Sequence, residues 1–181
     1  MSARGGDQAY AVAEIQAMGY ASGDREGGDT DLIQPQTVQG SGNFSNNAGL
    51  MIDGRIPPEG SKEDSEACVF WDNPDTVFTI DLGKAYQVLG ILIQADGNDS
   101  YRLDYSLDGR DYFALCEIRQ DMGEIETGME TICTLPDHEE YITDLDFFPV
   151  QARYIKIYAD SGEGTFSVSE VQVYGKSLSS H

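Results

Sequence analysis

Residues 76–94 read TVFTIDLGKAYQVLGILIQ, and this stretch decides the fold. Every second residue from Phe78 to Leu82 is large and apolar, which is the period-2 pattern of a strand with one buried face. A turn is expected at Gly83. The run 88–93 is apolar at nearly every position, which predicts a second, central strand with both faces covered.

Short runs of the same kind fill the rest of the chain. Residues 101–106 alternate, Asp108-Gly109 is a hairpin signal, and residues 153–158 and 166–174 are rich in β-branched and aromatic side chains. Apart from a weak stretch at residues 8–18, no segment keeps a helical period. The pattern predicts an all-β sandwich or jelly roll.

The order of four motifs resembles the discoidin domain, also called the coagulation factor V/VIII (F5/8) type C domain, and its relatives in carbohydrate-binding module family 32. The motifs are Asp-Leu-Gly at 81–83, Ile-Asp-Gly at 52–54, YSLDG at 105–109, and ARYIKI at 152–157 followed by SEVQVYG at 169–175. The resemblance covers residues 45–175. It implies a galactose-binding-like jelly-roll sandwich of about eight antiparallel strands with long loops.

With 181 residues, the chain has the length of one domain with a core of its own. We expect a sandwich over residues 45–175, a tail over 176–181, and an extension over 1–44 that either precedes the sandwich or belongs to it. Within the extension, residues 10–19 align without gaps on residues 166–175, the segment that closes this type of domain. They are the tail of a preceding repeat, a strand that pairs beside its look-alike, or a coincidence.

The charge of the chain is strongly acidic. Eleven basic and 32 acidic residues give a formal net charge of −21, which disfavours nucleic acid and anionic membranes as partners. No run approaches the roughly 18 apolar residues of a membrane span, and no signal-peptide pattern is visible in this fragment. The carboxylates either solubilise a surface or, in part, bind calcium. A secreted or cell-surface location is an expectation drawn from the family.

The three cysteines form no C-x-x-C motif. Two interpretations stay open: a disulfide between Cys116 and Cys133 with Cys68 as a free thiol, or three buried thiols.

Signals for catalysis are weak. The chain has two histidines, His138 and His181, and none of the common hydrolase, metalloprotease, nucleotide or dinucleotide motifs. A glycosidase-like pair of carboxylates carries no signal among 32 acidic residues. We therefore expect a domain that is not an enzyme.

The resemblance implies a calcium ion between the Asp-Gly loop and the last strand, with Asp53 and Glu170 at the two matching positions. The alternation in the last strand slips by one at Ser169-Glu170, which predicts a β-bulge that re-aims the Glu170 carboxylate. The residues after Asp53-Gly54 depart from the family, which often has a Thr or Asp there. The alternative is that Asp53 caps a turn while Glu170 pairs with a Lys or Arg.

Sugar-binding relatives use loops at one end of the sandwich, where an aromatic ring and a few polar groups meet the sugar. Here Trp71, in the run FWDN at 70–73, offers the ring. A second loop offers polar groups and a tyrosine: Asp96, Asn98, Asp99 and Tyr101. Neither loop carries a His or Arg. The alternatives are that Trp71 packs in the core and that the loop side chains stabilise a turn.

The sequence therefore predicts a non-catalytic, lectin-like module of a larger secreted or cell-surface protein, bound to a glycan and stabilised by calcium. The rival hypothesis is a protein-interaction or adhesion module on the same fold, with a cell-surface protein as its partner. Membrane insertion is not expected, because basic residues and apolar spikes are lacking.

Overall fold

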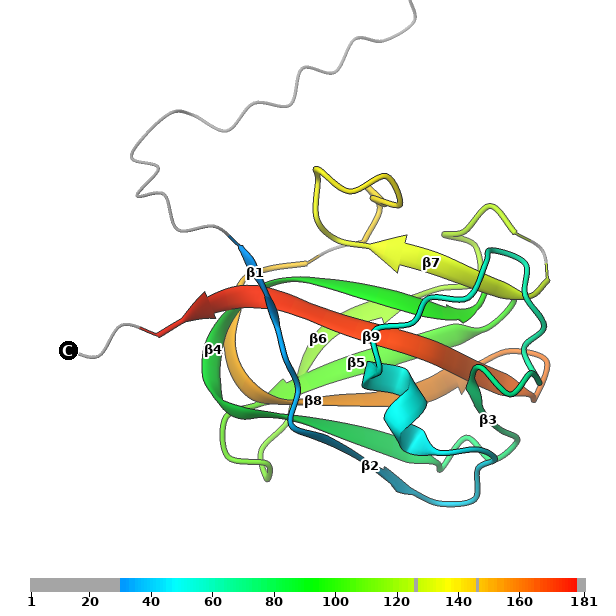
Figure 1. Ribbon diagram of the computed structural model, residues 1–181, viewed down its shortest axis with the longest axis horizontal. Coiled ribbons are helices and arrows are strands. Elements are labelled where there is room, and N and C mark those ends of the chain that lie inside the picture. The colour runs from blue at the N-terminus through cyan, green and yellow to red at the C-terminus, as the bar shows by residue number, and fades with distance from the viewer. Residues whose placement is uncertain (1–29, 126, 146, 179–181) are drawn as a thin grey trace, which may run out of the picture.

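The computed structural model describes residues 30–125, 127–145 and 147–178. This part of the chain is almost entirely β-structure (Figure 1). Its elements are β1 (Asp31–Ile33), β2 (Thr37–Ser41), the 3-10 helix η1 (Ala48–Ile52), β3 (Val69–Trp71), β4 (Val77–Asp96), β5 (Ser100–Ser106), β6 (Phe113–Ile118), β7 (Met129–Cys133), β8 (Val150–Ser161) and β9 (Phe166–Ser177).

The strand β4 organises the fold. Its first half pairs with β2 and β8, and its second half pairs mainly with β9 and β7. The register against β8 shifts between Asp81 and Tyr86, around Gly83, whose φ of 85° favours glycine. The turn predicted at Gly83 is therefore a corner inside one continuous strand, and the two predicted strands are its two halves.

This corner carries the chain from one layer of the sandwich to the other (Figure 1). The pairing order is β1-β9-β4-β8-β5-β6, with β2, β3 and β7 attached to β4 and β9, and every pairing between strands is antiparallel. The sheet folds over itself without closing into a barrel. The prediction of an all-β, galactose-binding-like sandwich is confirmed.

The core lies between the layers and contains the apolar faces that the alternation predicted. Phe78, Ile80, Leu103, Ile155 and Ile157 are all fully buried. Removing this much apolar surface from water is the main favourable term in folding.

The bulge predicted in the last strand is also confirmed. Gln94 lies opposite Glu170 but Ala95 lies opposite Val168, which leaves Ser169 without a partner in the register. The extra residue shifts Glu170 relative to the residues before it.

Residues 30–44 take part in the sheet, because β1 pairs with β9 and β2 with β4. The look-alike segment at 10–19 lies outside the described residues. Cys68, Cys116 and Cys133 are buried free thiols, as in the second of the two interpretations. In the described part of the chain, no helix has the length and apolarity that crossing a membrane would require.

Candidate functional site

One end of the sandwich carries a hollow of about 260 Å³ between β3 and two loops. It combines aromatic and polar side chains and is lined by Asn43, Phe44, Ser45, Phe70, Trp71, Asp72 and Thr165. The short strand β3 explains the aromatic wall. Val69 and Trp71 are buried, so Phe70 between them points the other way and is half-exposed. The Ser45 amide donates to the Phe70 carbonyl (2.8 Å) and holds the neighbouring loop beside the strand.

Trp71 itself lies in the core. Its side chain is 2% exposed, and its ring centroid lies 5.0 Å from that of Phe78, 6.2 Å from Tyr101 and 6.1 Å from Phe166. A ring enclosed in this way offers no open face to a sugar. Its position is that of the core-packing alternative, and Phe70 holds the exposed position for which Trp71 was predicted.

The predicted polar loop is a tight turn between β4 and β5, and most of it faces inward. Asp96 and Asp99 are each 1% exposed, whereas Asn98 is half-buried. The Asp99 carboxylate accepts a hydrogen bond from the Glu163 amide (3.0 Å). Asp99 thereby anchors the loop between β8 and β9, the loop that brings Thr165 to the hollow.

Burial shifts both carboxyl groups toward the neutral form. Loss of hydration, with repulsion from Asp96 as a smaller cause, raises the pKa of Asp99 to about 7. Loss of hydration and the nearby Glu63 charge raise the pKa of Asp96 to about 6. Neither Asp96 oxygen has a hydrogen-bond partner among the described residues.

Tyr101 is fully buried, and its hydroxyl group joins β5 to β9 by hydrogen bonds. Its hydroxyl donates to the Ser167 carbonyl (3.0 Å) and accepts from the Ser167 amide (2.9 Å). The same hydroxyl lies 3.5 Å from Asp99 Oδ2. The structure thus brings Trp71, Asp99 and Tyr101 together, but as buried side chains that hold the elements around the hollow and are not exposed in it.

The sequence interpretation missed Phe70, Phe44 and Asp72 as lining residues. The alternation of the two faces along β3 was the sequence signal that could have identified Phe70 and Asp72. Once Trp71 is assigned to the core, its neighbours on the strand must face the other way. Nothing local marks Phe44, because it reaches the hollow from a distant loop.

The two predicted metal ligands meet at a different place. The helix η1 is capped by Asn47 at its start and by Asp53 at its end, and Gly54 then adopts a φ of 79°. In this left-handed backbone conformation the Gly54 amide faces Glu170 and donates a hydrogen bond to its Oε2 at 3.1 Å. Glu170 is 2% exposed, and burial raises its pKa to about 7.

A small cavity of about 80 Å³ adjoins Asp53 and Glu170. Asp53 Oδ1 accepts the Arg55 amide at 2.9 Å, as the turn-cap alternative requires. The other half of that alternative is not met, because none of the ion pairs among the described residues involves Glu170.

Comparison with protein families decides the assignment. The family model of the F5/8 type C domain matches residues 35–171. This chain belongs to that family. No curated protein matches the chain.

Solved structures similar to this F5/8 type C domain include three binding modules. The CBM32 module of AlyQ, in complex with 4,5-unsaturated mannuronic acid, has 15% identity and a TM-score of 0.55, covering 79% of this chain and 97% of that one. A fucose-binding module of Streptococcus pneumoniae has 13% identity and a TM-score of 0.55, covering 81% and 96%. The lectin domain of lectinolysin, a mutant complexed with Lewis b, has 16% identity and a TM-score of 0.54, covering 82% and 99%. At these identities the likeness concerns the fold.

Proposed function

We propose that this F5/8 type C domain is a non-catalytic carbohydrate-binding module that binds its glycan in the hollow beside β3. The observation that carries the proposal is the lining of that hollow, where the half-exposed Phe70 and Phe44 lie next to Asp72, Asn43 and Ser45. The sugar ligands of the three similar modules support the same class of ligand.

An aromatic wall beside polar groups suits a sugar ring. The C–H face of a pyranose packs on Phe70, while the Asp72 carboxylate and the Asn43 amide exchange hydrogen bonds with its hydroxyls. The hollow is open and small, so little surface is buried and the affinity for a single sugar is expected to be weak.

A rival function has an observation of its own. Leu107 and Phe113 are 53% and 60% exposed, and they lie in a hollow of about 500 Å³. Its other lining residues are the apolar or aromatic Tyr105, Pro149 and Val150 and the polar Asp108, Asp111 and Gln151. An exposed apolar patch is typical of a protein-binding surface. If the domain acts in adhesion by binding a cell-surface protein, this is the surface that would carry it.

A calcium ion at Asp53 and Glu170 is part of the proposal. The two carboxylates suit such an ion, because Ca²⁺ takes oxygen ligands and Asp53 and Glu170 both line the cavity between η1 and β9. Among the described residues no group of three or more His, Cys, Asp or Glu could hold a metal. Backbone carbonyls would therefore complete the shell. A bound ion would neutralise the buried Glu170 carboxylate and tie η1 to β9.

A glycan array, read with and without a calcium chelator, tests the proposal. We expect one or a few related glycans to bind the wild type, and binding to be lost in Phe70→Ala and Asp72→Ala. Phe113→Ala is the matched control, since it removes an aromatic ring from the other hollow. Failure of every glycan to bind would favour the adhesion function, whereas loss of binding only in Phe113→Ala would place the sugar in the other hollow and contradict the site proposed here.

A further inference from the structure

The chain contains two Asn-x-Ser/Thr tripeptides, the acceptor pattern for N-linked glycosylation. They are Asn43-Phe44-Ser45, in the loop between β2 and η1, and Asn98-Asp99-Ser100, at the turn between β4 and β5. The pattern also arises by chance, so the surroundings of each asparagine decide whether the folded domain can carry a glycan there.

The first tripeptide is anchored by its central residue. The Phe44 ring lies 5.0 Å from that of Phe78, whose side chain is fully buried. Asn43 and Ser45, on either side of Phe44, are both exposed. The asparagine and the hydroxyl residue of the acceptor pattern are therefore presented to solvent while Phe44 is held against the core.

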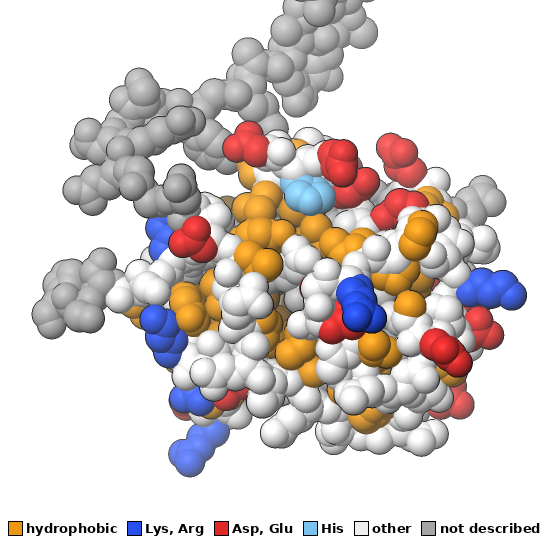
Figure 2. Space-filling view, in the orientation of Figure 1, with side chains coloured by type: hydrophobic (Ala, Val, Ile, Leu, Met, Phe, Trp, Pro, Cys, Tyr) orange, Lys and Arg blue, Asp and Glu red, His pale blue; other side chains and the backbone are white. Residues whose placement is uncertain are grey.

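The backbone of this tripeptide is also held in place. The Asn43 carbonyl accepts a hydrogen bond from the Thr76 hydroxyl (3.3 Å), and the Ser45 amide donates to the Phe70 carbonyl (2.8 Å). Both bonds use main-chain groups of the tripeptide, so a sugar added to the Asn43 side chain breaks neither of them. The strand β2, which precedes this loop, runs along the lower edge of the molecule in Figure 1, and that edge is mostly uncharged in the same view (Figure 2).

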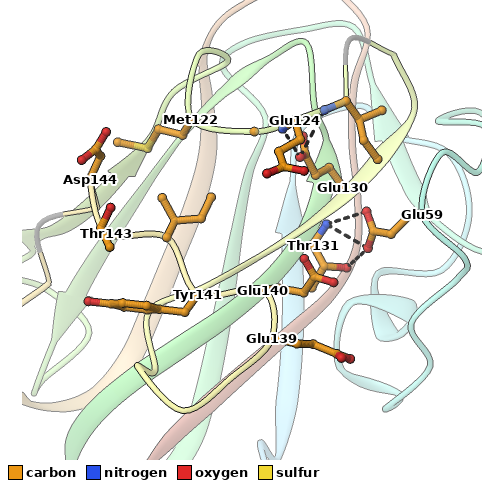
Figure 3. A pocket seen from close by; sticks show the side chains of 13 residues that line it. Glu59, Met122, Glu124, Glu130, Thr131, Glu139, Glu140, Tyr141, Thr143 and Asp144 are labelled. Carbon is orange, nitrogen blue, oxygen red and sulfur yellow. Dashed lines mark hydrogen bonds between the residues drawn. The ribbon is translucent and has the colours of Figure 1, made fainter. Parts of the chain in front are cut away.

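The second tripeptide is enclosed. Ser100 is 5% exposed, and Oδ1 of Asn98 is buried. The Ser100 hydroxyl oxygen accepts a hydrogen bond from the Gln120 amide (3.1 Å). Gln120 belongs to the loop that continues through Met122 and Glu124 (Figure 3). The structure therefore distinguishes the two tripeptides, one of them open to solvent and the other held under a loop.

We propose that Asn43 is the acceptor of an N-linked glycan and that this glycan covers the hollow beside β3. The co-reactant is an oligosaccharide carried on a lipid diphosphate, so the protein must pass through a compartment that supplies it. A bond forms between Asn43 Nδ2 and the anomeric carbon of the oligosaccharide, and the bond from that carbon to the diphosphate oxygen breaks. The lipid diphosphate leaves with the electron pair, and one Nδ2 proton passes to a base of the transferase.

The position of Asn43 links this modification to the hollow. Asn43 lines the hollow together with Phe70, Asp72 and Thr165. A glycan attached by one side chain stays at that rim at an effective concentration in the millimolar range. It therefore competes with a free glycan for the same aromatic wall. This competition rests on the proposed function, whereas the attachment itself does not.

Mass spectrometry tests the attachment on the whole chain, secreted from cultured eukaryotic cells behind a cleavable signal peptide. We expect a glycan that peptide-N-glycosidase removes, with ¹⁸O from labelled water incorporated at position 43. Asn43→Gln and Ser45→Ala should each abolish the glycan, whereas Ser45→Thr and Asn98→Gln should retain it. Secretion of the wild type without a glycan, or ¹⁸O incorporation at Asn98 alone, would overturn the proposal. The position of the label is read on the wild type, so the test does not depend on whether a variant folds.

The covering of the hollow is tested by comparing ¹H–¹⁵N spectra of the glycosylated chain and of the unmodified chain made in bacteria. We expect amide shifts at residues 70–72 and 165 as well as at 43–45, because the glycan lies over the hollow. Shifts confined to residues 43–45 would show that the glycan points away and would overturn this part of the proposal.

The spectral comparison uses no free ligand, so its outcome is independent of the glycan array. A failure of every glycan on the array would contradict the proposed function and leave the attachment and the covering as measured. For a glycan that the array identifies, the glycosylated chain should bind about tenfold more weakly than the unmodified chain. Equal binding by the two preparations would contradict the competition.

Discussion

Replacing Phe70 and Trp71 by alanine, one at a time, distinguishes a residue proposed to contact the glycan from a residue that packs in the core. The two aromatic residues are neighbours on β3, yet Trp71 is 2% exposed and surrounded by three aromatic rings, whereas Phe70 is half-exposed at the hollow. Trp71→Ala should therefore reduce stability, and Phe70→Ala should reduce glycan binding.

The magnitudes follow from burial. Removing a fully packed Trp leaves a cavity among Phe78, Tyr101 and Phe166 and costs about 3–5 kcal/mol. For a domain of this size, that loss lowers the Tm by about 10 °C. Phe70 loses only part of its contacts, so Phe70→Ala should cost about 1 kcal/mol or less.

Thermal and denaturant unfolding of the three proteins, followed by far-UV circular dichroism, measures the difference. Titration with the glycan found on the array then gives the loss of affinity for Phe70→Ala at a temperature where it is fully folded. A Tm for Trp71→Ala within about 2 °C of the wild type, or a larger fall for Phe70→Ala than for Trp71→Ala, would refute the assignment of the two faces of β3.

Two further predictions concern the carboxylates. The raised pKa of Asp99, about 7, means that the native state keeps this proton at pH values where the unfolded chain has lost it, so stability should fall as the pH rises from 5 to 8. Over that range the free energy of unfolding of Asp99→Asn should fall by about 2 kcal/mol less than that of the wild type, as measured by urea unfolding at each pH. Parallel curves for the two proteins would contradict the burial of this carboxyl group. If Asp53 and Glu170 hold calcium, chelation should lower the Tm of the wild type and leave Glu170→Gln unchanged. An unchanged wild-type Tm on chelation would show that the cavity beside Glu170 holds no stabilising ion.

The fold could be predicted from sequence because the patterns that indicate its strands involve only neighbouring residues. Alternation in residues 76–82 and the slip at Ser169 each depend on a few neighbouring residues and are both present in the structure. In residues 101–106 the alternation of burial holds for Tyr101 and Leu103 but not beyond the register shift that follows Leu103. Gly83 was predicted to be a turn between two strands, because sequence cannot distinguish such a turn from a corner inside one strand that pairs with β8 before and after it.

The candidate site was predicted only in part, because orientation is set by distant contacts. Asp99 and Tyr101 were predicted to face a sugar at one end of the sandwich, yet Ser167 and Glu163, more than 60 positions away, hold their side chains inward. The same holds for Glu59, which lies 72 positions from Thr131, the residue whose amide donates a hydrogen bond to its carboxylate.

Backbone amide shifts on addition of a glycan test the central claim most directly. A ¹H–¹⁵N spectrum, recorded during titration with the glycan found on the array, reports which amides sense the ligand. The account predicts the largest shifts at residues 43–45, 70–72 and 165, which line the hollow beside β3. Shifts confined to Leu107, Phe113 and Val150, or spread evenly over the surface, would contradict it.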